Sequence, residues 1–170
     1  MKIIFLDFDG VLNSHKYMGS DAYKKETQGM TGGQVMKLAH HAHIDPAALK
    51  ILNKLVDQTG ATVVVSSTWR IIYSVEELNK MCKARGATFT IVDKTPELPR
   101  RFSEFIPRGK EIQAYIDSLP QIPEGILIID DWENMIHLSP YLLRTNEADG
   151  IKNSQIKLAI KILNKSYVNK

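Results

Sequence analysis

Three short apolar runs, each followed at once by polar side chains, are the feature that most constrains how this chain can fold. The runs cover residues 2–6, 61–65 and 126–129. Their continuous apolar and β-branched character, without polar alternation, is typical of strands that are buried on both faces. We therefore expect strands of a parallel sheet that lies inside the protein.

Helical patterns separate these runs. Asp45-Pro46 indicates an N-cap with proline at the first helical position, and leucines then follow at helical spacing up to Gly60. We predict further helices over 75–85, 110–118 and 151–163, and weaker strands over 89–92 and 141–145. Strands that alternate with helices predict an α/β fold, a Rossmann-like three-layer α/β/α sandwich around a central, mostly parallel sheet.

The length of 170 residues predicts one domain over residues 1–170, with a core of its own. A content of 44% hydrophobic and 24% charged residues is ordinary for a globular protein and argues against long disorder. Residues 13–44 show only weak periodicity. This stretch is long enough for a flap or a small cap over a site, but too short for a large cap domain.

Cysteine usage and the N-terminus bear on the location of the protein. Cys82 has no second cysteine to pair with, which favours a reducing cytoplasm. Four apolar residues before Asp7 are too few for a signal-peptide core or a membrane span, so we expect no membrane partner. The net charge of +3 could favour a polyanionic substrate or simply reflect a solvated helix face.

The carboxyl ends of the three predicted strands carry the residues with chemical potential. Asp7, Ser66 and Asp130 each follow a strand directly. In a parallel sheet these ends meet at one edge, and ligands bind in the crevice outside that edge. We therefore expect the three residues to share one site.

Asp7 and Asp9 are candidates for covalent catalysis and proton transfer. A carboxylate can attack phosphorus and form an aspartyl-phosphate, provided that a second group handles the proton of the leaving group. The predicted nucleophile is Asp7, and the predicted acid and later base is Asp9. Gly10 lets the chain turn closely around a ligand.

Phosphoryl transfer also needs charge neutralisation. A hydroxyl from Ser66 or Ser67 could bond the phosphoryl oxygens, and Arg108 or Lys110 could balance their charge. Carboxylate oxygens are the ligands that Mg²⁺ prefers. The candidate ligands of a magnesium cofactor are Asp7, Asp9, Asp130 and Asp131.

The segment after the second apolar run supplies candidates for substrate binding. These candidates, together with Gly10, are Ser67, Thr68, Trp69 and Arg70. An indole face can stack on a base, and a guanidinium can hold a second phosphate. The alternative is a tryptophan that closes the core and an arginine paired with a surface carboxylate.

These motifs together resemble those of the haloacid dehalogenase (HAD) superfamily. FLDFDGVLN resembles its first motif, VVVSST its second, Arg108 or Lys110 the cation of its third, and ILIIDD its fourth. The resemblance spans about residues 2–131. TGATVVVSSTWR followed by PRGKEIQAYI is similar to a small subgroup of phage and bacterial domains, some of them attached to RNA-repair proteins.

The resemblance implies a Mg²⁺-dependent phosphatase that forms an aspartyl-phosphate. The acid at Asp9 favours a phosphatase over the dehalogenase branch, and the subgroup pattern leans towards Arg108 over Lys110. A site without a large cap is accessible to bulky substrates, so we expect a nucleotide or a nucleic-acid terminal phosphate. Three alternatives stay open: a phosphotransferase, a non-catalytic binding module, and a phosphatase of other small metabolites or phosphoproteins.

Overall fold

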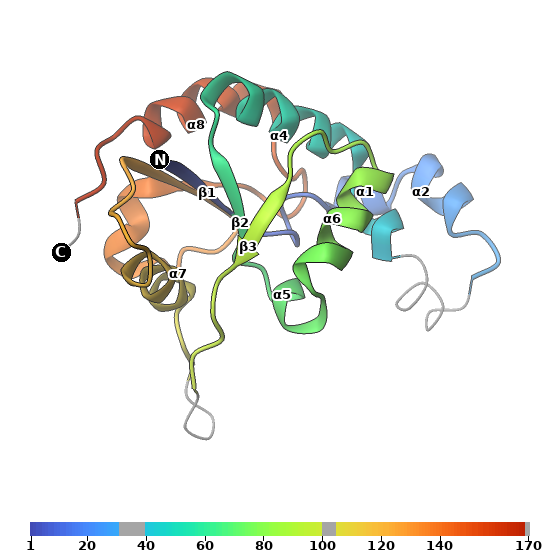
Figure 1. Ribbon diagram of the computed structural model, residues 1–170. Coiled ribbons are helices and arrows are strands. Elements are labelled where there is room, and N and C mark those ends of the chain that lie inside the picture. The colour runs from blue at the N-terminus through green and yellow to red at the C-terminus, as the bar shows by residue number, and fades with distance from the viewer. Residues whose placement is uncertain (31–39, 100–104, 169–170) are drawn as a thin grey trace.

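A five-stranded parallel sheet forms the centre of the protein in the computed structural model, which describes residues 1–30, 40–99 and 105–168. The strand order is β3-β2-β1-β4-β5, and every pair of neighbours is parallel (Figure 1). The strands are β1 (Lys2–Leu6), β2 (Thr62–Val65), β3 (Ile91–Lys94), β4 (Gly125–Asp130) and β5 (Leu142–Arg144). The three apolar runs are β2, β1 and β4, the three central strands of this sheet.

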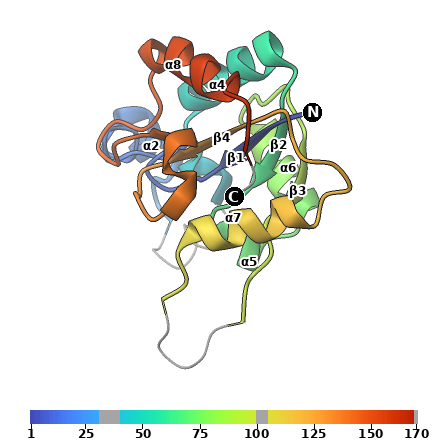
Figure 2. The same ribbon diagram turned by 90° about the vertical axis from the view of Figure 1, so that its left-hand side faces the viewer.

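Helices cover both faces of the sheet and make three layers. One face carries α4 (Pro46–Thr59), α6 (Val75–Ala84) and α8 (Ile156–Leu163). The other carries α7 (Arg108–Asp117) and the 3₁₀ helix η2 (Ile136–Tyr141). Figures 1 and 2 show α4 and α8 on one side of the strands and α7 on the other. The predicted three-layer α/β/α sandwich is confirmed.

The core explains why the central strands read as unbroken apolar runs. Ile4 and Leu6 of β1 pack against the layer of α4 and α8, whereas Ile3 and Phe5 pack against α7. Both faces of β1 are therefore buried, as expected for a parallel sheet with helices on both sides. Leu52 of α4 and Ile112 of α7 are fully buried on opposite sides of the sheet.

Local signals place α4 where the sequence predicts it. The side chain of Asp45 accepts a hydrogen bond from the backbone N–H of Ala47 at 2.8 Å, and Pro46 occupies the first turn. The helix ends at Thr59, where the N–H of Gly60 donates to the carbonyl of Val56. These caps satisfy backbone groups that a helix end otherwise leaves unpaired.

Three predicted elements begin at least two residues away from where the structure has them. The strand expected over 89–92 is β3 at Ile91–Lys94, because the side chain of Asn79 bonds both backbone groups of Ile91. The helix expected from residue 110 begins at Arg108. The helix expected from residue 151 begins at Ile156, after the 3₁₀ helix η3 (Asn153–Gln155).

The segment after β1 contains short helices that the sequence did not predict. They are α1 (His15–Met18), α2 (Asp21–Glu26) and the 3₁₀ helix η1 (His40–His43). Arg85, at the end of α6, anchors this segment: its Nε donates to the carbonyl of Ile44 at 2.9 Å, and its guanidinium pairs with Glu26 at 2.6 Å. Part of the predicted flap, residues 31–39, lies outside the described residues.

One further helix, α5 (Trp69–Ile72), is separated from the end of β2 by three residues and carries Trp69 and Arg70, two of the predicted substrate-binding residues. Over the ranges that the structure describes, no helix has both the length and the apolar character needed to cross a membrane.

Candidate active site

The register of the sheet brings three strand ends to one level. Leu6 lies opposite Val65 on one side and opposite Ile129 on the other. The next residues along the three strands are therefore level as well, and they are Ser66, Asp7 and Asp130. The chain continues from β1 to β2 and β3 on one side and returns to β4 on the other, which places the site at the topological switch point.

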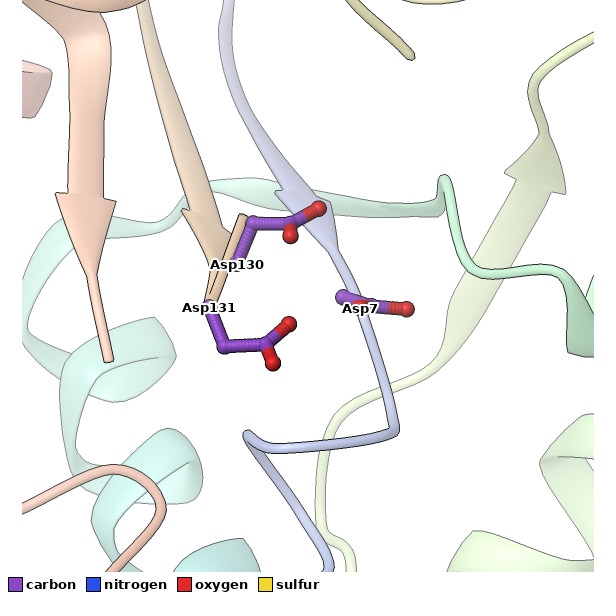
Figure 3. Close-up of side chains that lie close together, drawn as sticks. All are labelled: Asp7, Asp130 and Asp131. Carbon is purple, nitrogen blue, oxygen red and sulfur yellow. The ribbon is translucent and has the colours of Figure 1, made fainter. Parts of the chain in front are cut away.

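Three carboxylates gather at this switch point. Asp7, Asp130 and Asp131 each offer a carboxylate oxygen, and these oxygens all lie within 4.8 Å of one another. Figure 3 shows the side chains leaving the ends of two neighbouring strands. Asp130 is fully buried and Asp7 is 3% exposed. Buried carboxylates this close together require positive charge nearby.

Arg108 supplies one positive charge. Its Nη1 lies 2.7 Å from Oδ2 of Asp7 and 2.5 Å from Oδ2 of Asp130. Burial opposes the charge of Arg108, but the two carboxylates outweigh it and raise the pKa above its ordinary value. Lys110, the other predicted cation, is exposed and is not among the residues that line the cavity described below.

Gly109 determines how closely Arg108 approaches the carboxylates. A Cβ atom at position 109 would lie 2.2 Å from the carbonyl oxygen of Met135. The N–H of Gly109 donates to the carbonyl of Asn134 at 3.2 Å. The first turn of α7 thus packs directly on the backbone that follows β4, which only glycine allows, and this contact holds Arg108 beside Asp130.

The acidic cluster has perturbed ionisation. Burial, followed by the charge of Asp7, raises the pKa of Asp130 to about 7, against the lowering effect of Arg108 and of the Trp132 backbone N–H. Burial and the charge of Asp7 also raise the pKa of Asp131. Repulsion between neighbouring carboxylates is thus only partly relieved by Arg108.

The cluster has the charge and ligand chemistry of a divalent metal site. With all groups ionised, three carboxylates and one guanidinium leave two negative charges, which one divalent cation would balance. Hard oxygen ligands suit Mg²⁺. Gly10 has a φ of +68°, and a Cβ there would lie 2.6 Å from Cγ of Asp131. The loop after β1 can pack against Asp131 only because residue 10 is glycine.

Asp9 lies apart from this three-carboxylate group and has its own donors. Nδ2 of Asn13 donates to one carboxylate oxygen at 2.7 Å, and Nε1 of Trp69 donates to the other at 3.0 Å. Asn13 is itself held by the N–H of Gly10 at 3.0 Å, and the Trp69 ring stacks on Phe8 with centroids 4.9 Å apart. The orientation of the Asp9 carboxyl group is therefore fixed from both sides.

The polar residues after β2 differ in their surroundings. Ser66 and Ser67 are fully buried, whereas Thr68 is exposed and lines the cavity. The hydroxyl of Ser66 has no hydrogen-bond partner among the described residues, although the residue is level with Asp7. Oγ of Ser67 accepts from the backbone N–H of Trp69 at 3.4 Å. Thr68 thus presents its hydroxyl to the cavity, whereas the hydroxyl of Ser66 is unpaired and buried.

Arg70 is engaged within the protein. Its Nη2 lies 2.5 Å from Oε2 of Glu111, and both side chains are nearly fully buried. Its Nη1 donates to the carbonyls of Ser66 and Ser67 at 3.0 Å each. Glu111 lies one turn after Arg108 on α7, so this pair connects the end of β2 to the helix that carries Arg108. Of the two roles expected for Arg70, pairing with a carboxylate fits better than contact with a second phosphate. The expected partner was a surface carboxylate, whereas Glu111 is buried.

Most of these groups open into one cavity of about 760 Å³, whereas Ser66, Ser67 and Asp130 are buried behind its lining. Its lining includes Asp7, Asp9, Arg108 and Asp131, together with apolar side chains from α5 and the loop after β4. His15, Met18 and His43 also line it, so the segment after β1 forms one of its walls. The predicted flap thus borders the site over its described residues.

Several residues of the site were not predicted as site residues, among them Asn13, Glu111, Gly109 and Trp132. Glycine in the first turn of a helix, as in Arg108-Gly109, is a signal of a close backbone contact that the sequence did contain. The partners of Asn13 and Glu111 lie on other elements, so the sequence alone carried no signal for them.

Comparisons with known proteins identify the family of the chain. The model of the family described as the HAD domain in Swiss Army Knife RNA repair proteins matches residues 3–156, which include all the predicted site residues. No curated protein compared with the chain matches it.

Solved structures show the same fold. The HAD domain of the effector protein Lem4 from Legionella pneumophila is 18% identical, with a TM-score of 0.54 over 96% of this chain and 95% of that domain. An inactive mutant of that domain gives 15% identity and a TM-score of 0.55, over 96% and 94%. At such identity the likeness concerns the fold alone. The family match covers most of the chain, which therefore belongs to the HAD domains found in Swiss Army Knife RNA repair proteins.

Proposed function

We propose that the chain is a Mg²⁺-dependent phosphomonoesterase that acts through an aspartyl-phosphate on Asp7. The observation that carries the proposal is the arrangement of two unlike carboxylates at one cavity. Asp7 is buried and paired with Arg108 at 2.7 Å, whereas Asp9 is exposed to the cavity and held by two N–H donors. Such a division suits one nucleophile and one proton-transfer group.

In the proposed first step, an oxygen of Asp7 attacks phosphorus. The bond from phosphorus to the ester oxygen breaks as Asp9 gives that oxygen its proton. Arg108 bonds Asp7 and lies where it can also bond a phosphoryl oxygen. The three-carboxylate group would hold Mg²⁺, which would supply positive charge and so reduce repulsion between Asp7 and the phosphoryl oxygens.

In the proposed second step, ionised Asp9 takes a proton from a water molecule that attacks phosphorus. The bond from phosphorus to Asp7 breaks, and inorganic phosphate leaves. The N–H donors of Asn13 and Trp69 support both steps, because each carboxyl oxygen keeps a lone pair for them whether or not Asp9 is protonated. Asn13 and Trp69 are thus positioning residues.

Hydroxyl groups complete the phosphoryl site in this proposal. Ser66 is buried beside Asp7 with an unpaired hydroxyl, and a buried hydroxyl without a partner is costly. A phosphoryl oxygen would satisfy it. Thr68 offers a second hydroxyl to the cavity, whereas Ser67 already bonds the backbone of Trp69.

For the substrate we propose a nucleotide or a nucleic-acid terminal phosphate. The family to which the chain belongs occurs in RNA repair proteins, and the cavity of about 760 Å³ is far larger than a phosphoryl group needs. We also propose a cytoplasmic location, which the lone buried cysteine, Cys82, supports.

Phosphate release from a substrate panel tests the proposal. The panel contains nucleotides, phosphorylated oligonucleotides, sugar phosphates and para-nitrophenyl phosphate, with and without Mg²⁺. Asp7→Asn is the matched control, because it removes the nucleophile with little change in volume. We expect release that needs both Mg²⁺ and Asp7. Near-wild-type phosphate release by a folded Asp7→Asn variant would contradict the mechanism. Transfer of the phosphoryl group to an added alcohol in place of water would identify a phosphotransferase.

A further inference from the structure

Large apolar side chains gather at the mouth of the active-site cavity. Trp132 is 57% exposed, Phe105 is 63% exposed and Ile72 is 69% exposed, and all three line this one cavity. Single exposed apolar residues are ordinary on protein surfaces, but a group around a hollow marks a binding site for an apolar partner. We call these three residues the apolar rim.

Trp132 is fixed close to the chemical centre although its ring is exposed. It follows Asp131 in the chain, and its backbone N–H donates to Oδ1 of Asp130 at 2.9 Å. No aromatic ring among the described residues stacks on it, in contrast to Trp69, which stacks on Phe8. The backbone of Trp132 is thus held at the cavity, and the exposed indole face is available to a ligand.

The proposed acid indicates where the leaving group lies. Asp9 must reach the ester oxygen, so the alcohol part of a substrate departs on the Asp9 side of the cavity. Trp69 bonds Asp9 there, and Tyr73 follows with its ring centroid 5.8 Å from that of Trp69. Both residues line the cavity, as does Ile72 of the apolar rim between them. The alcohol part therefore leaves along an apolar wall.

We propose that the apolar rim binds the nucleobase of the substrate, with the base stacked on Trp132. This inference rests on the proposed function and deepens it. A sugar separates the base from the phosphate, so phosphate at Asp7 leaves the base further out, where the exposed side chains of the rim lie. A ring bonded directly to the phosphate oxygen would instead lie deep, beside Asp9 and Trp69.

Substrates that share a phosphate but differ in the attached group test the proposal. Binding of 5′-AMP, ribose 5-phosphate and phosphotyrosine to the Asp7→Asn variant in Mg²⁺ is measured by calorimetry, with and without Trp132→Ala. We expect 5′-AMP to bind more tightly than ribose 5-phosphate. Trp132→Ala should reduce that preference about tenfold, the loss expected when one stack between a base and an aromatic ring is removed.

Ile122→Ala is the matched control. Ile122 is 62% exposed, but it lies before the start of β4 and therefore near the opposite edge of the sheet. The control should leave the preference for 5′-AMP unchanged. Thermal unfolding of both alanine variants verifies that the fold is retained.

Three outcomes would overturn the proposal: equal binding of 5′-AMP and ribose 5-phosphate, a preference that survives Trp132→Ala, or an equal loss for phosphotyrosine, which would indicate a directly attached aryl ring. The experiment separates this inference from the proposed function, because binding does not require turnover. If the chain binds 5′-AMP through its base but releases no phosphate, the nucleobase site at the apolar rim stands and the proposed phosphatase activity is rejected.

Discussion

The indole N–H of Trp69 donates to Asp9 at 3.0 Å while the same ring stacks on Phe8, the residue between Asp7 and Asp9. One side chain from α5 thus contacts two residues of the first motif. Trp69 was predicted to contact substrate or to close the core. Its contacts favour a third role, in which it fixes the carboxylate that we propose as the proton-transfer group.

Trp69→Phe should separate proton transfer from the rest of catalysis. Phenylalanine keeps a ring against Phe8 but lacks the N–H donor. We expect kcat/KM to fall about tenfold for nucleotides, the loss of one hydrogen bond to a charged group. Hydrolysis of para-nitrophenyl phosphate should fall much less, because its leaving group needs no proton.

Tyr141→Phe provides the control for that experiment. It also removes a polar donor from a ring, the hydroxyl that bonds the carbonyl of Ser166, but it lies outside the residues that line the cavity. It should leave both rates unchanged. An equal loss for the two substrates in Trp69→Phe would contradict the positioning role.

Arg108→Ala should lower kcat strongly, whereas Lys110→Ala should leave it almost unchanged. Arg108 contacts two carboxylates of the site, so its removal should lower kcat by about a hundredfold or more, as for other preorganised charge-stabilising groups. Lys110 is exposed, and its removal should leave kcat within about twofold of wild type, as is usual for such surface changes. Steady-state kinetics in saturating Mg²⁺ compare the two, and a larger loss in Lys110→Ala would reverse the assignment of the cation.

Arg70→Met should destabilise the fold. It leaves Glu111 buried without its partner, and breaking such a pair costs about 3 to 5 kcal/mol of unfolding free energy. Urea denaturation measures the loss. Arg144→Met is the control, because the Arg144–Glu133 pair is exposed and such pairs contribute about 0 to 1 kcal/mol. Equal midpoints for the two variants would exclude a structural role for Arg70 and favour substrate contact.

Mg²⁺ should stabilise the protein more at about pH 8 than at about pH 5.5. The pKa of Asp130 is raised to about 7, so its contribution to the stability of the metal-free protein is present at low pH and is lost as pH rises through 7. Mg²⁺ binds the ionised carboxylate of Asp130, so stabilisation by Mg²⁺ should increase as pH rises.

Thermal unfolding with and without Mg²⁺ measures this dependence. At about one hundred times Kd, the metal should add about 2.7 kcal/mol at the higher pH. Asp130→Asn should abolish most of the difference between the two pH values. A Mg²⁺ effect independent of pH in the wild type would remove Asp130 from the ligand set.

The sequence predicted the sheet and the residues at its carboxyl edge because these depend on local pattern. A strand buried on both faces must be apolar throughout, and the first polar residue after it marks its end, as Asp7 and Asp130 do. The pattern failed for α1 and α2, which are four and six residues long. Helices of that length contain too few turns to show a period.

The contacts that orient the site could not be predicted from the sequence. Asp9 and Trp69 are 60 residues apart in the chain. Arg70 could equally have faced a substrate or an internal carboxylate, because the guanidinium suits both. The choice depends on the packing of α7 against the sheet, and thus on the close contact at Gly109.

The level alignment of Asp7, Ser66 and Asp130 determines when the proposed activity can appear during folding. The three residues lie at the carboxyl ends of the central strand and its two neighbours. In the chain, α4 lies between Asp7 and Ser66, and α6 and α7 lie between Ser66 and Asp130. Long-range parallel pairing is intrinsically slow, because loops must close before the contacts form. On refolding, recovery of enzyme turnover should therefore coincide with the docking of β4 onto β1 rather than with the earlier appearance of helical signal.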